Sequence, residues 1–307
     1  KKWGKSLDES IDKVAKLVQY AADKNVGIWI WLRWSDVNNP ANDWESMRTF
    51  FEKIAKTGIK GIKIDFMDSA SKERLAFYDA VAKNLAKNKI MVNFHGANTP
   101  TGEERAWPHE MTREGIYGGE QNIWGTISGQ HYCALPFTRL VSGHADFTGG
   151  YFGHGVKLRG SSWPLQMATN IIYTSPLLHW ISNPKDMEAA FPKGSPERDL
   201  IRNIPSTWDE TIVLSPSKIG ECAAFARRSG DQWYIALMNG DAGERTVSIP
   251  LDFLKKDIPY KATILRDLSD KNDGWNVETK DVSSQDKLDF TMRVKGGGIA
   301  RLVPAGK

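Results

Sequence analysis

The amino-acid sequence predicts an α/β fold of the (β/α)8-barrel type, followed by a small all-β sandwich domain. Patterns of helix and strand alternate over the first two-thirds of the chain, with about 30 residues from one strand to the next, as in a parallel sheet. After Trp208 strand patterns dominate, and the turns between them carry Gly, Asp and Asn. Charged or polar residues close several of the early strands, where the functional residues of a barrel lie.

The helices of the first part are predicted from apolar residues that recur at the helical period. They cover residues 8–24, 44–57, 71–87 and 163–174. The barrel strands are predicted from short runs of alternating or continuous apolar residues. They lie near residues 27–33, 60–66, 90–95, 114–119, 144–147 and 177–180. A complete barrel of this type has eight strands, so we expect the barrel to be incomplete at its N-terminus and the chain to belong to a longer protein.

The chain after residue 207 has the pattern of short strands separated by turn residues. The strand segments are TIVLS, GECAAFARRS, QWYIALMNG, ERTVSIPL, YKATILRDL, KLDFTMRVK and GIARLVPA. Such a series, without helices between the strands, is typical of a β-sandwich of about 100 residues. We therefore predict two domains, a truncated barrel over residues 1–207 and a C-terminal sandwich over residues 208–307.

The composition argues against two classes of partner. The chain has 307 residues, is 40% hydrophobic and carries a net charge of +4, with its lysines spread evenly. A protein that binds nucleic acid or a membrane surface would carry a basic block, and a membrane span would need about 18 consecutive apolar residues. The sequence contains neither, so we expect no nucleic-acid partner and no membrane partner. Cys133 and Cys222 are expected to be separate buried thiols.

The segment GIKIDF, at residues 61–66, places charge inside a strand that otherwise has a buried pattern. Ile62 and Ile64 alternate with Lys63 and Asp65, and a strand sends alternate side chains to opposite faces. We expect the charged pair to face the barrel axis and to reach its mouth, because the lower interior would not tolerate an unpaired charge. An alternative is an ion pair between Lys63 and Asp65 that only fills the barrel.

Three successive strands are predicted to end in the ionisable residues Asp65, His95 and Glu120. The carboxyl ends of barrel strands meet at one mouth, so these side chains should lie close together. An aspartate and a glutamate at the mouth of a barrel rich in tryptophan indicate glycoside hydrolysis. In that reaction one carboxylate attacks or activates water, and one carboxylic acid protonates the leaving oxygen. Acidic pairs of this kind also hold metal ions in other barrel enzymes.

The stretches GIKIDFMD and NFHGANTPTGEERAWPHEMTREGIYGGEQ, together with the order of a barrel and a β-domain, resemble glycoside hydrolase family 97 over nearly the whole chain. The resemblance implies a protein that hydrolyses α-glycosides, binds calcium beside its active site and carries a further N-terminal β-sandwich. We expect that sandwich to be missing from this chain, so that the fragment binds calcium weakly or not at all. The resemblance also implies an oligosaccharide or α-glycoside substrate and a periplasmic or secreted location.

The resemblance assigns roles to individual residues. Glu120, in YGGEQ, matches the general acid/base, and Glu114, in TREGIYGG, matches a calcium-ligating glutamate; Glu120 is expected to contact the same ion. His95 matches a histidine that contacts substrate. The inverting α-glucosidase branch lacks the strand-end aspartate and has a glutamate directly after this histidine, whereas this chain has Asp65 and Gly96 there. The chain therefore resembles the retaining branch, which includes α-galactosidases, with Asp65 as the nucleophile.

Four further residues are interpreted from strand parity and residue type. Lys63 is predicted to contact sugar hydroxyls and to favour the ionised form of Asp65. Trp34 either stacks on a sugar or packs in the core. Asp146 belongs either to the site or to a solvated loop, and Glu110 is expected on the surface of a loop.

The function predicted first is thus an exo-acting retaining α-glycoside hydrolase of the α-galactosidase type. Two alternatives stay open. One is an inverting α-glucosidase of the same family, which would release the opposite anomer. The other is a non-catalytic carbohydrate-binding protein on a decayed barrel, which would keep its aromatic residues and could lose its acids. The presence of both Asp65 and Glu120 argues against the second alternative.

Overall fold

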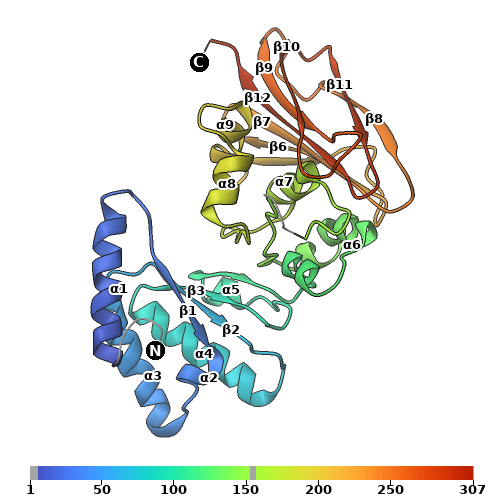
Figure 1. Ribbon diagram of the computed structural model, residues 1–307. Helices are drawn as coiled ribbons and strands as arrows, with labels where there is room; N and C mark the ends of the chain where they lie inside the picture. The colour runs from blue at the N-terminus through green and yellow to red at the C-terminus, as the bar shows by residue number, and fades with distance from the viewer. Residues whose placement is uncertain (1–5, 153–156, 307) are drawn as a thin grey trace. The chain divides into compact units, whose positions relative to one another are not determined.

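The computed structural model describes residues 6–152 and 157–306, which form two compact units (Figure 1). The first unit contains the described residues up to Ile116 together with Ser142–Asp146. The second unit contains Tyr117–Val141 and the described residues from Phe147 onward. The second unit therefore includes helices that precede the C-terminal strands, and the domain boundary at residue 207 stays a prediction.

A four-stranded parallel sheet forms the centre of the first unit. Its strands, in spatial order, are β1 (Trp29–Arg33), β2 (Gly61–Asp65), β3 (Met91–Phe94) and β4 (Glu110–Arg113). Its helices are α1 (Leu7–Ala22), α2 (Trp34–Val37), α3 (Ala41–Ala55), α4 (Lys72–Lys87) and α5 (Glu103–Ala106). The three long helices match the helices predicted from the apolar period. Helices α3 and α4 carry the chain back to the start of the next parallel strand, as a parallel sheet requires.

Serine residues begin two of the long helices. The hydroxyl oxygen of Ser6 accepts a hydrogen bond from the backbone N–H of Glu9 at the start of α1. The hydroxyl of Ser71 accepts one from the backbone N–H of Arg74 at the start of α4. Each bond satisfies an amide that has no partner within its helix, which typically contributes about 1 kcal/mol to stability.

The two faces of β2 lie in different environments, as the alternation predicted. Ile62 and Ile64 are fully buried in the core that the sheet forms with α3 and α4. Burial of such a side chain contributes roughly 1.5–3 kcal/mol. Lys63 and Asp65 project from the other face, and Lys63 is paired in the strand register with Trp31 of β1. The apolar face of the strand therefore holds it in the core. The charged face contributes to a group of ionisable side chains at the carboxyl end of the sheet, called here the strand-end cluster and formed by Lys63, Asp65, His95, Glu114 and Asp146.

The strand predicted at residues 114–119 is wrong. The chain pairs with β3 through β4, which ends before Glu114. Gly115 then adopts a left-handed φ of 46°, which ends the extended segment. The next regular element is the short 3-10 helix η1 (Gly119–Ile123).

The two last predicted barrel strands are reduced to isolated bridges. Ala145 makes a parallel bridge to Arg113 of β4, and Trp180 makes a parallel bridge to Gly149. Across residues 6–152 and 157–306, the parallel strands form an open four-stranded sheet and no closed barrel is present, whereas the sequence predicted an incomplete barrel of six strands.

The second unit is built on antiparallel strands. The strands are β5 (Glu210–Val213), β6 (Cys222–Ser229), β7 (Gln232–Asn239), β8 (Arg245–Pro250), β9 (Tyr260–Arg266), β10 (Asn276–Val282), β11 (Lys287–Met292) and β12 (Gly297–Pro304). Six of them form one sheet, in the order β10-β9-β12-β7-β6-β5, and β11 pairs with β8 in a second sheet. Leu237 and Ile264 of the larger sheet share a core with Phe290 of the smaller one. These two layers agree with the predicted sandwich.

Strand β10 was missed by the sequence analysis. It lies at the edge of the larger sheet and pairs only with β9 in the described order. Of its seven residues only Val282 is buried. An edge strand with so little apolar burial lacks the regular alternation from which strands are predicted.

The helices of the second unit come before its strands in the chain. They are η1 (Gly119–Ile123), α6 (Gly129–Ala134), η2 (Leu135–Phe137), η3 (Arg139–Val141), α7 (Trp163–Ile172), α8 (Pro184–Ala190) and α9 (Pro196–Arg202). Every residue of α7 is buried, and the helix lies against β7 and β12. An apolar helix of this kind is expected where packing covers it on all sides.

The carboxylate of Asp267 joins the start of α7 to the β-sheet region. One of its oxygens accepts from the hydroxyl of Ser162, the residue that caps α7. The other oxygen accepts from the backbone N–H groups of Arg293 and Gly297, each at 3.0 Å. Burial raises the pKa of Asp267 to about 6, and these hydrogen bonds oppose the rise. The carboxyl group therefore connects the start of α7 to the β-strand region, and it titrates at a pH of about 6.

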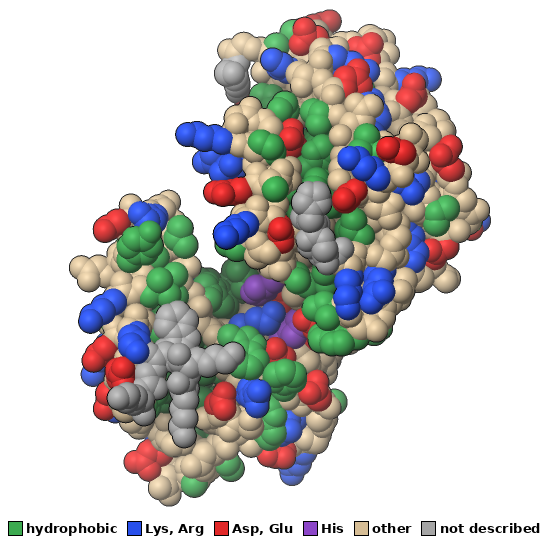
Figure 2. Space-filling view, viewed as in Figure 1, with side chains coloured by type: hydrophobic (Ala, Val, Ile, Leu, Met, Phe, Trp, Pro, Cys, Tyr) green, Lys and Arg blue, Asp and Glu red, His purple; other side chains and the backbone are tan. Residues whose placement is uncertain are grey.

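The surface agrees with the composition. Figure 2 shows Lys and Arg side chains interspersed with Asp and Glu side chains on the visible face of each unit. Among the helices in the described part of the chain, none is long and apolar enough to cross a membrane. Cys133 and Cys222 are free and buried, as expected.

Asp267→Asn should remove part of the pH dependence of stability. The folded state binds the Asp267 proton more tightly than the unfolded state, so stability is complete below the unfolded pKa and is lost as pH rises from about 4 to about 6. The loss should be about 2–3 kcal/mol. Asparagine stays neutral and still offers an oxygen to the two N–H groups, so urea-unfolding free energies measured from pH 4 to pH 7 should decline less in the variant.

The exposed Asp252 provides a matched control for that exchange. Asp252→Asn should leave the decline as it is in the wild type. An equal decline in wild type and Asp267→Asn would show that Asp267 does not titrate in this range.

Candidate active site

Three ionisable residues close successive strands of the parallel sheet in the first unit. Asp65 is the last residue of β2, His95 directly follows β3, and Glu114 directly follows β4. The carboxyl ends of parallel strands lie at one edge of a sheet, so the topology brings these residues to that edge. The prediction of strand-end positions was right for Asp65 and His95, but the residue that follows β4 is Glu114 and not Glu120.

The carboxylate of Asp65 is held by two N–H donors. Its Oδ2 accepts from the indole Nε1 of Trp31 at 2.9 Å, and its Oδ1 accepts from the backbone N–H of Phe66 at 2.6 Å. Phe66 has a φ of 62°, an uncommon conformation for a bulky residue that turns the chain sharply after β2. The sequence analysis missed Trp31, although its place opposite Lys63 in the register puts it on the same face of the sheet.

A buried carboxylate, Asp146, joins the side chains of two neighbouring strands. Asp146 is fully buried, and its Oδ2 lies 2.7 Å from Lys63 Nζ and 2.7 Å from His95 Nδ1. The ion pair of Lys63 is thus made with Asp146 rather than with Asp65, and Asp146 belongs to the cluster rather than to a solvated loop. The predicted influence of Lys63 on the ionisation of Asp65 stays a prediction.

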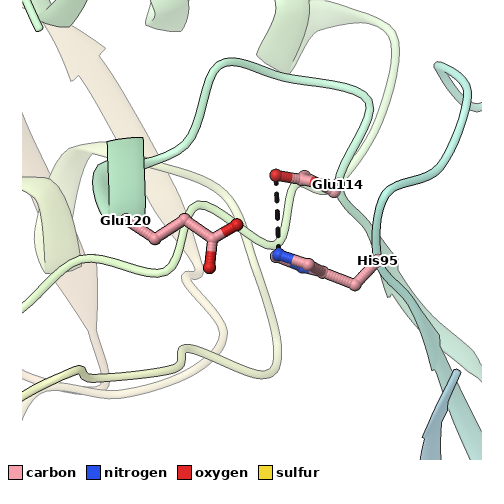
Figure 3. A group of neighbouring side chains, drawn as sticks. All are labelled: His95, Glu114 and Glu120. Carbon is pink, nitrogen blue, oxygen red and sulfur yellow. Dashed lines mark ion pairs between the residues drawn. The ribbon is translucent and has the colours of Figure 1, made fainter. Parts of the chain in front are cut away.

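His95 lies between Asp146 and Glu114. Its Nε2 is 3.5 Å from Glu114 Oε1, and Figure 3 shows the two side chains pointing toward one another. The second carboxylate oxygen of Glu114 accepts from the backbone N–H of Gly96 at 2.6 Å. Both His95 and Glu114 are buried, so these contacts fix the directions of both side chains.

Gly96 has a backbone conformation that favours glycine, and little space surrounds it. Its φ is 56°, and a Cβ atom there would lie 2.8 Å from Asp68 Oδ1 and 3.2 Å from the backbone nitrogen of Met67. A Cβ atom at residue 96 would therefore require small shifts of the Asp68 side chain and of the turn that follows Asp65, in addition to the strain of the positive φ.

Glu120 belongs to the second unit, where it lies in η1. The N–H of the preceding Gly119 donates to the carbonyl of Phe147, and a Cβ on Gly119 would lie only 2.5 Å from the carbonyl oxygen of Thr148. This close approach requires glycine beside Glu120. Tyr151 is also buried in this unit, and its hydroxyl has no hydrogen-bond partner among the described residues. Burial raises the pKa of Tyr151, and the charges of Tyr132 and Glu120 contribute further.

The opposite face of the sheet carries a separate buried ion pair. Glu110, expected on a loop surface, is a buried residue of β4, and its carboxylate accepts two hydrogen bonds from Arg113 at 2.8 and 3.1 Å. The Arg113 guanidinium lies over the ring of Tyr78 and also donates to Asn98 Oδ1. Burial raises the pKa of Glu110, and Arg113 opposes the rise. Sequence analysis misplaced Glu110 because it placed the strand four residues too late.

Trp34 begins α2 and packs toward α4. Its ring makes an edge contact with Phe77 and lies beneath the guanidinium of Arg74. Core packing was one of its two sequence interpretations. The role of Trp34 as a substrate contact stays a prediction.

Glu114 is a suitable donor for the calcium ion that the resemblance implies, because calcium prefers carboxylate oxygens. Calcium takes six to eight oxygen ligands, and the imidazole nitrogen beside Glu114 is not a ligand that it prefers. The cluster of the first unit thus fits calcium only in part, through Glu114, and further oxygen ligands are required.

Comparisons with known proteins agree with the sequence resemblance. A family model described as "Glycoside hydrolase 97" matches residues 5–116, and one described as "Glycosyl-hydrolase 97 C-terminal, oligomerisation" matches residues 207–303. Together they cover more than half of the chain. The chain belongs to glycoside hydrolase family 97.

Curated relatives and solved structures lead to the same family. A protein of Streptomyces bingchenggensis (strain BCW-1) named "Probable retaining alpha-galactosidase" is 33% identical over 94% of this chain and 42% of its own length. The "Retaining alpha-galactosidase" of Bacteroides thetaiotaomicron is 32% identical over 97% of this chain and 46% of its own length. A family 97 enzyme from Pseudoalteromonas sp. strain K8, solved in complex with panose, is 26% identical with a TM-score of 0.81, over 95% of this chain and 49% of that one. The present chain therefore spans less than half the length of each of these three proteins.

Gly96→Ala should destabilise the first unit. The positive φ and the contacts with the turn after β2 should together cost about 1–3 kcal/mol of unfolding free energy, measured by urea denaturation. Gly102→Ala is the matched control, because Gly102 also has a positive φ but would place its Cβ in open space. A loss no larger at residue 96 than at residue 102 would show that the contact with the turn is unimportant.

Proposed function

We propose that the chain forms the catalytic part of an exo-acting retaining α-glycoside hydrolase, of the α-galactosidase type, with Asp65 as the nucleophile. The observation that carries the proposal is the position of Asp65, a half-buried carboxylate at the end of β2 that two N–H donors orient. The names of the two curated relatives, "Probable retaining alpha-galactosidase" and "Retaining alpha-galactosidase", support the substrate class. An α-glycoside or oligosaccharide is therefore the proposed substrate.

The proposed reaction has two steps. In the first, a carboxylate oxygen of Asp65 attacks the anomeric carbon while Glu120, as general acid, gives a proton to the departing glycosidic oxygen. In the second, Glu120 acts as general base and takes a proton from water, which attacks the anomeric carbon and releases Asp65. The hydrogen bonds from Trp31 and Phe66 hold the nucleophile in one orientation, which lowers the entropy loss on reaching the transition state.

Lys63 and His95 are the proposed substrate-binding residues of the first unit. Both contact Asp146 at the strand-end edge, and the ammonium of Lys63 and the imidazole of His95 are suitable hydrogen-bonding groups for sugar hydroxyls. Trp34 remains a proposed sugar contact on residue type alone.

The inverting α-glucosidase is the second candidate, because the Pseudoalteromonas enzyme was solved with panose. The inverting branch carries a glutamate where this chain has Gly96. A larger residue at position 96 would be strained by the positive φ and would crowd the turn after β2, and the absence of a glutamate there favours the retaining mechanism.

We also propose that Glu114 and Glu120 are calcium ligands. A bound calcium ion would supply positive charge beside the sugar. Isothermal titration of the full-length protein with calcium chloride should show binding, and Glu114→Gln should weaken it because the amide has no negative charge. Absence of binding, or equal affinity in the variant, would contradict this assignment.

A further N-terminal β-sandwich and a periplasmic or secreted location also stay predictions.

Asp65→Ala should lower hydrolysis of a nitrophenyl α-galactoside by about 10⁴-fold or more, because no covalent glycosyl intermediate forms without the carboxylate. The change leaves space for a small anion on the side of the nucleophile. Azide should therefore restore turnover and yield the β-glycosyl azide, identified by proton NMR.

The control for this test is Asp79→Ala on the exposed face of α4, which should hydrolyse the substrate like the wild type. Near wild-type activity of Asp65→Ala without azide would exclude Asp65 as nucleophile. Release of the inverted anomer by the wild type would favour the inverting candidate.

A further inference from the structure

Asp146 combines complete burial with charged partners from two different strands. It follows Ala145, whose bridge to β4 brings the segment beside the sheet. A single oxygen, Oδ2, lies 2.7 Å from both Lys63 Nζ and His95 Nδ1. Sequence reasoning left this residue undecided between the site and a solvated loop.

The cost of burying a charge indicates that this contact is specific. A carboxylate removed from water is strongly destabilising unless an opposite charge and hydrogen bonds replace its hydration. Lys63 supplies the charge, and its own side chain is 14% exposed, so the pair is largely shielded from solvent. Breaking such a pair on one side leaves the other charge buried and unpaired.

The same contact determines the tautomer of His95. An ionised carboxylate only accepts hydrogen bonds, so the proton on His95 must sit on Nδ1, the nitrogen that faces Asp146. The other nitrogen, Nε2, then faces Glu114. Asp146 therefore determines both the direction of the imidazole ring and which of its two nitrogens carries the proton.

We infer that Asp146 is a positioning residue, which holds Lys63 and His95 in the orientations that they need to bind sugar beside Asp65. This inference rests on the proposed function, since Lys63 and His95 act on a sugar only if the chain hydrolyses glycosides. Asp146 itself acts through its two partners. Its loss should therefore impair all substrates alike, whatever their leaving group.

The Glu110–Arg113 pair provides a control that distinguishes an effect on the orientation of Lys63 and His95 from an effect on folding stability alone. It is also buried and also involves a strand of this sheet, but it faces Tyr78 and Phe94 on the helix side. Removing its charge should lower stability without changing the strand-end residues. Glu110→Gln is therefore the matched control for Asp146→Asn.

The kinetic test compares Asp146→Asn with the wild type and with Glu110→Gln in the full-length enzyme. Asp146→Asn should lower kcat/KM by about 100-fold, by the same factor for a nitrophenyl galactoside and for an unactivated oligosaccharide, because orientation is lost rather than proton transfer. Glu110→Gln should lower the urea midpoint but leave kcat/KM close to wild type. Wild-type kcat/KM in Asp146→Asn would overturn the inference, as would an equal kinetic loss in both variants.

A second measurement is made on the wild type and does not depend on catalysis. The ¹H–¹⁵N NMR spectrum of the wild type should show a proton on His95 Nδ1, shifted downfield by the short bond to Asp146, and His95→Gln assigns the signal by removing it. A wild-type spectrum with the His95 proton only on Nε2 would overturn the inference. If the wild type hydrolyses no α-glycoside, the proposed function fails, and this spectrum still decides whether Asp146 orients His95.

Discussion

The ion pair between Lys63 and Asp146 is the interaction on which the strand-end cluster of the first unit depends. Successive side chains of β2 point alternately into the apolar core and toward the opposite face of the sheet. Lys63 therefore cannot turn to solvent without disrupting the packing of Ile62 and Ile64. A buried ammonium needs an acceptor, and Asp146 supplies it. Because the same oxygen also accepts from His95, one carboxylate fixes both neighbours.

Two buried ion pairs thus serve opposite faces of one sheet. On the helix side, the planar fork of Arg113 matches the carboxylate of Glu110 and holds the loop at Asn98, a geometry that lysine would not provide. On the strand-end side, the compact charge of Lys63 contacts a single oxygen of Asp146. The Glu110–Arg113 pair connects the segment after β3 to β4 through Asn98. The Lys63–Asp146 pair holds the side chain that lies next to Asp65 on the same face of β2.

Backbone geometry contributes as much as charge to the candidate site. Phe66 and Gly96 both have positive φ, in the turns that follow β2 and β3, and a side chain at residue 96 would crowd the turn after β2. Strain of this kind is tolerated where the surrounding structure compensates for it, and it is concentrated at functional sites. In the second unit, Gly119 plays a comparable part beside Glu120, where the backbone approaches Thr148 closely.

The sequence by itself determined the repeated pattern of helix and strand, the change to antiparallel strands, the family, and the strand-end positions of Asp65 and His95. These follow from local period and from motifs, which need no knowledge of distant neighbours. The tertiary structure decided that Asp146 pairs with Lys63 across 83 residues of sequence, that Trp31 donates to Asp65, and that Glu110 is buried. Each of these depends on strand register and on which segment lies beside the sheet, and one misplaced strand boundary was enough to move the predicted strand end from Glu114 to Glu120.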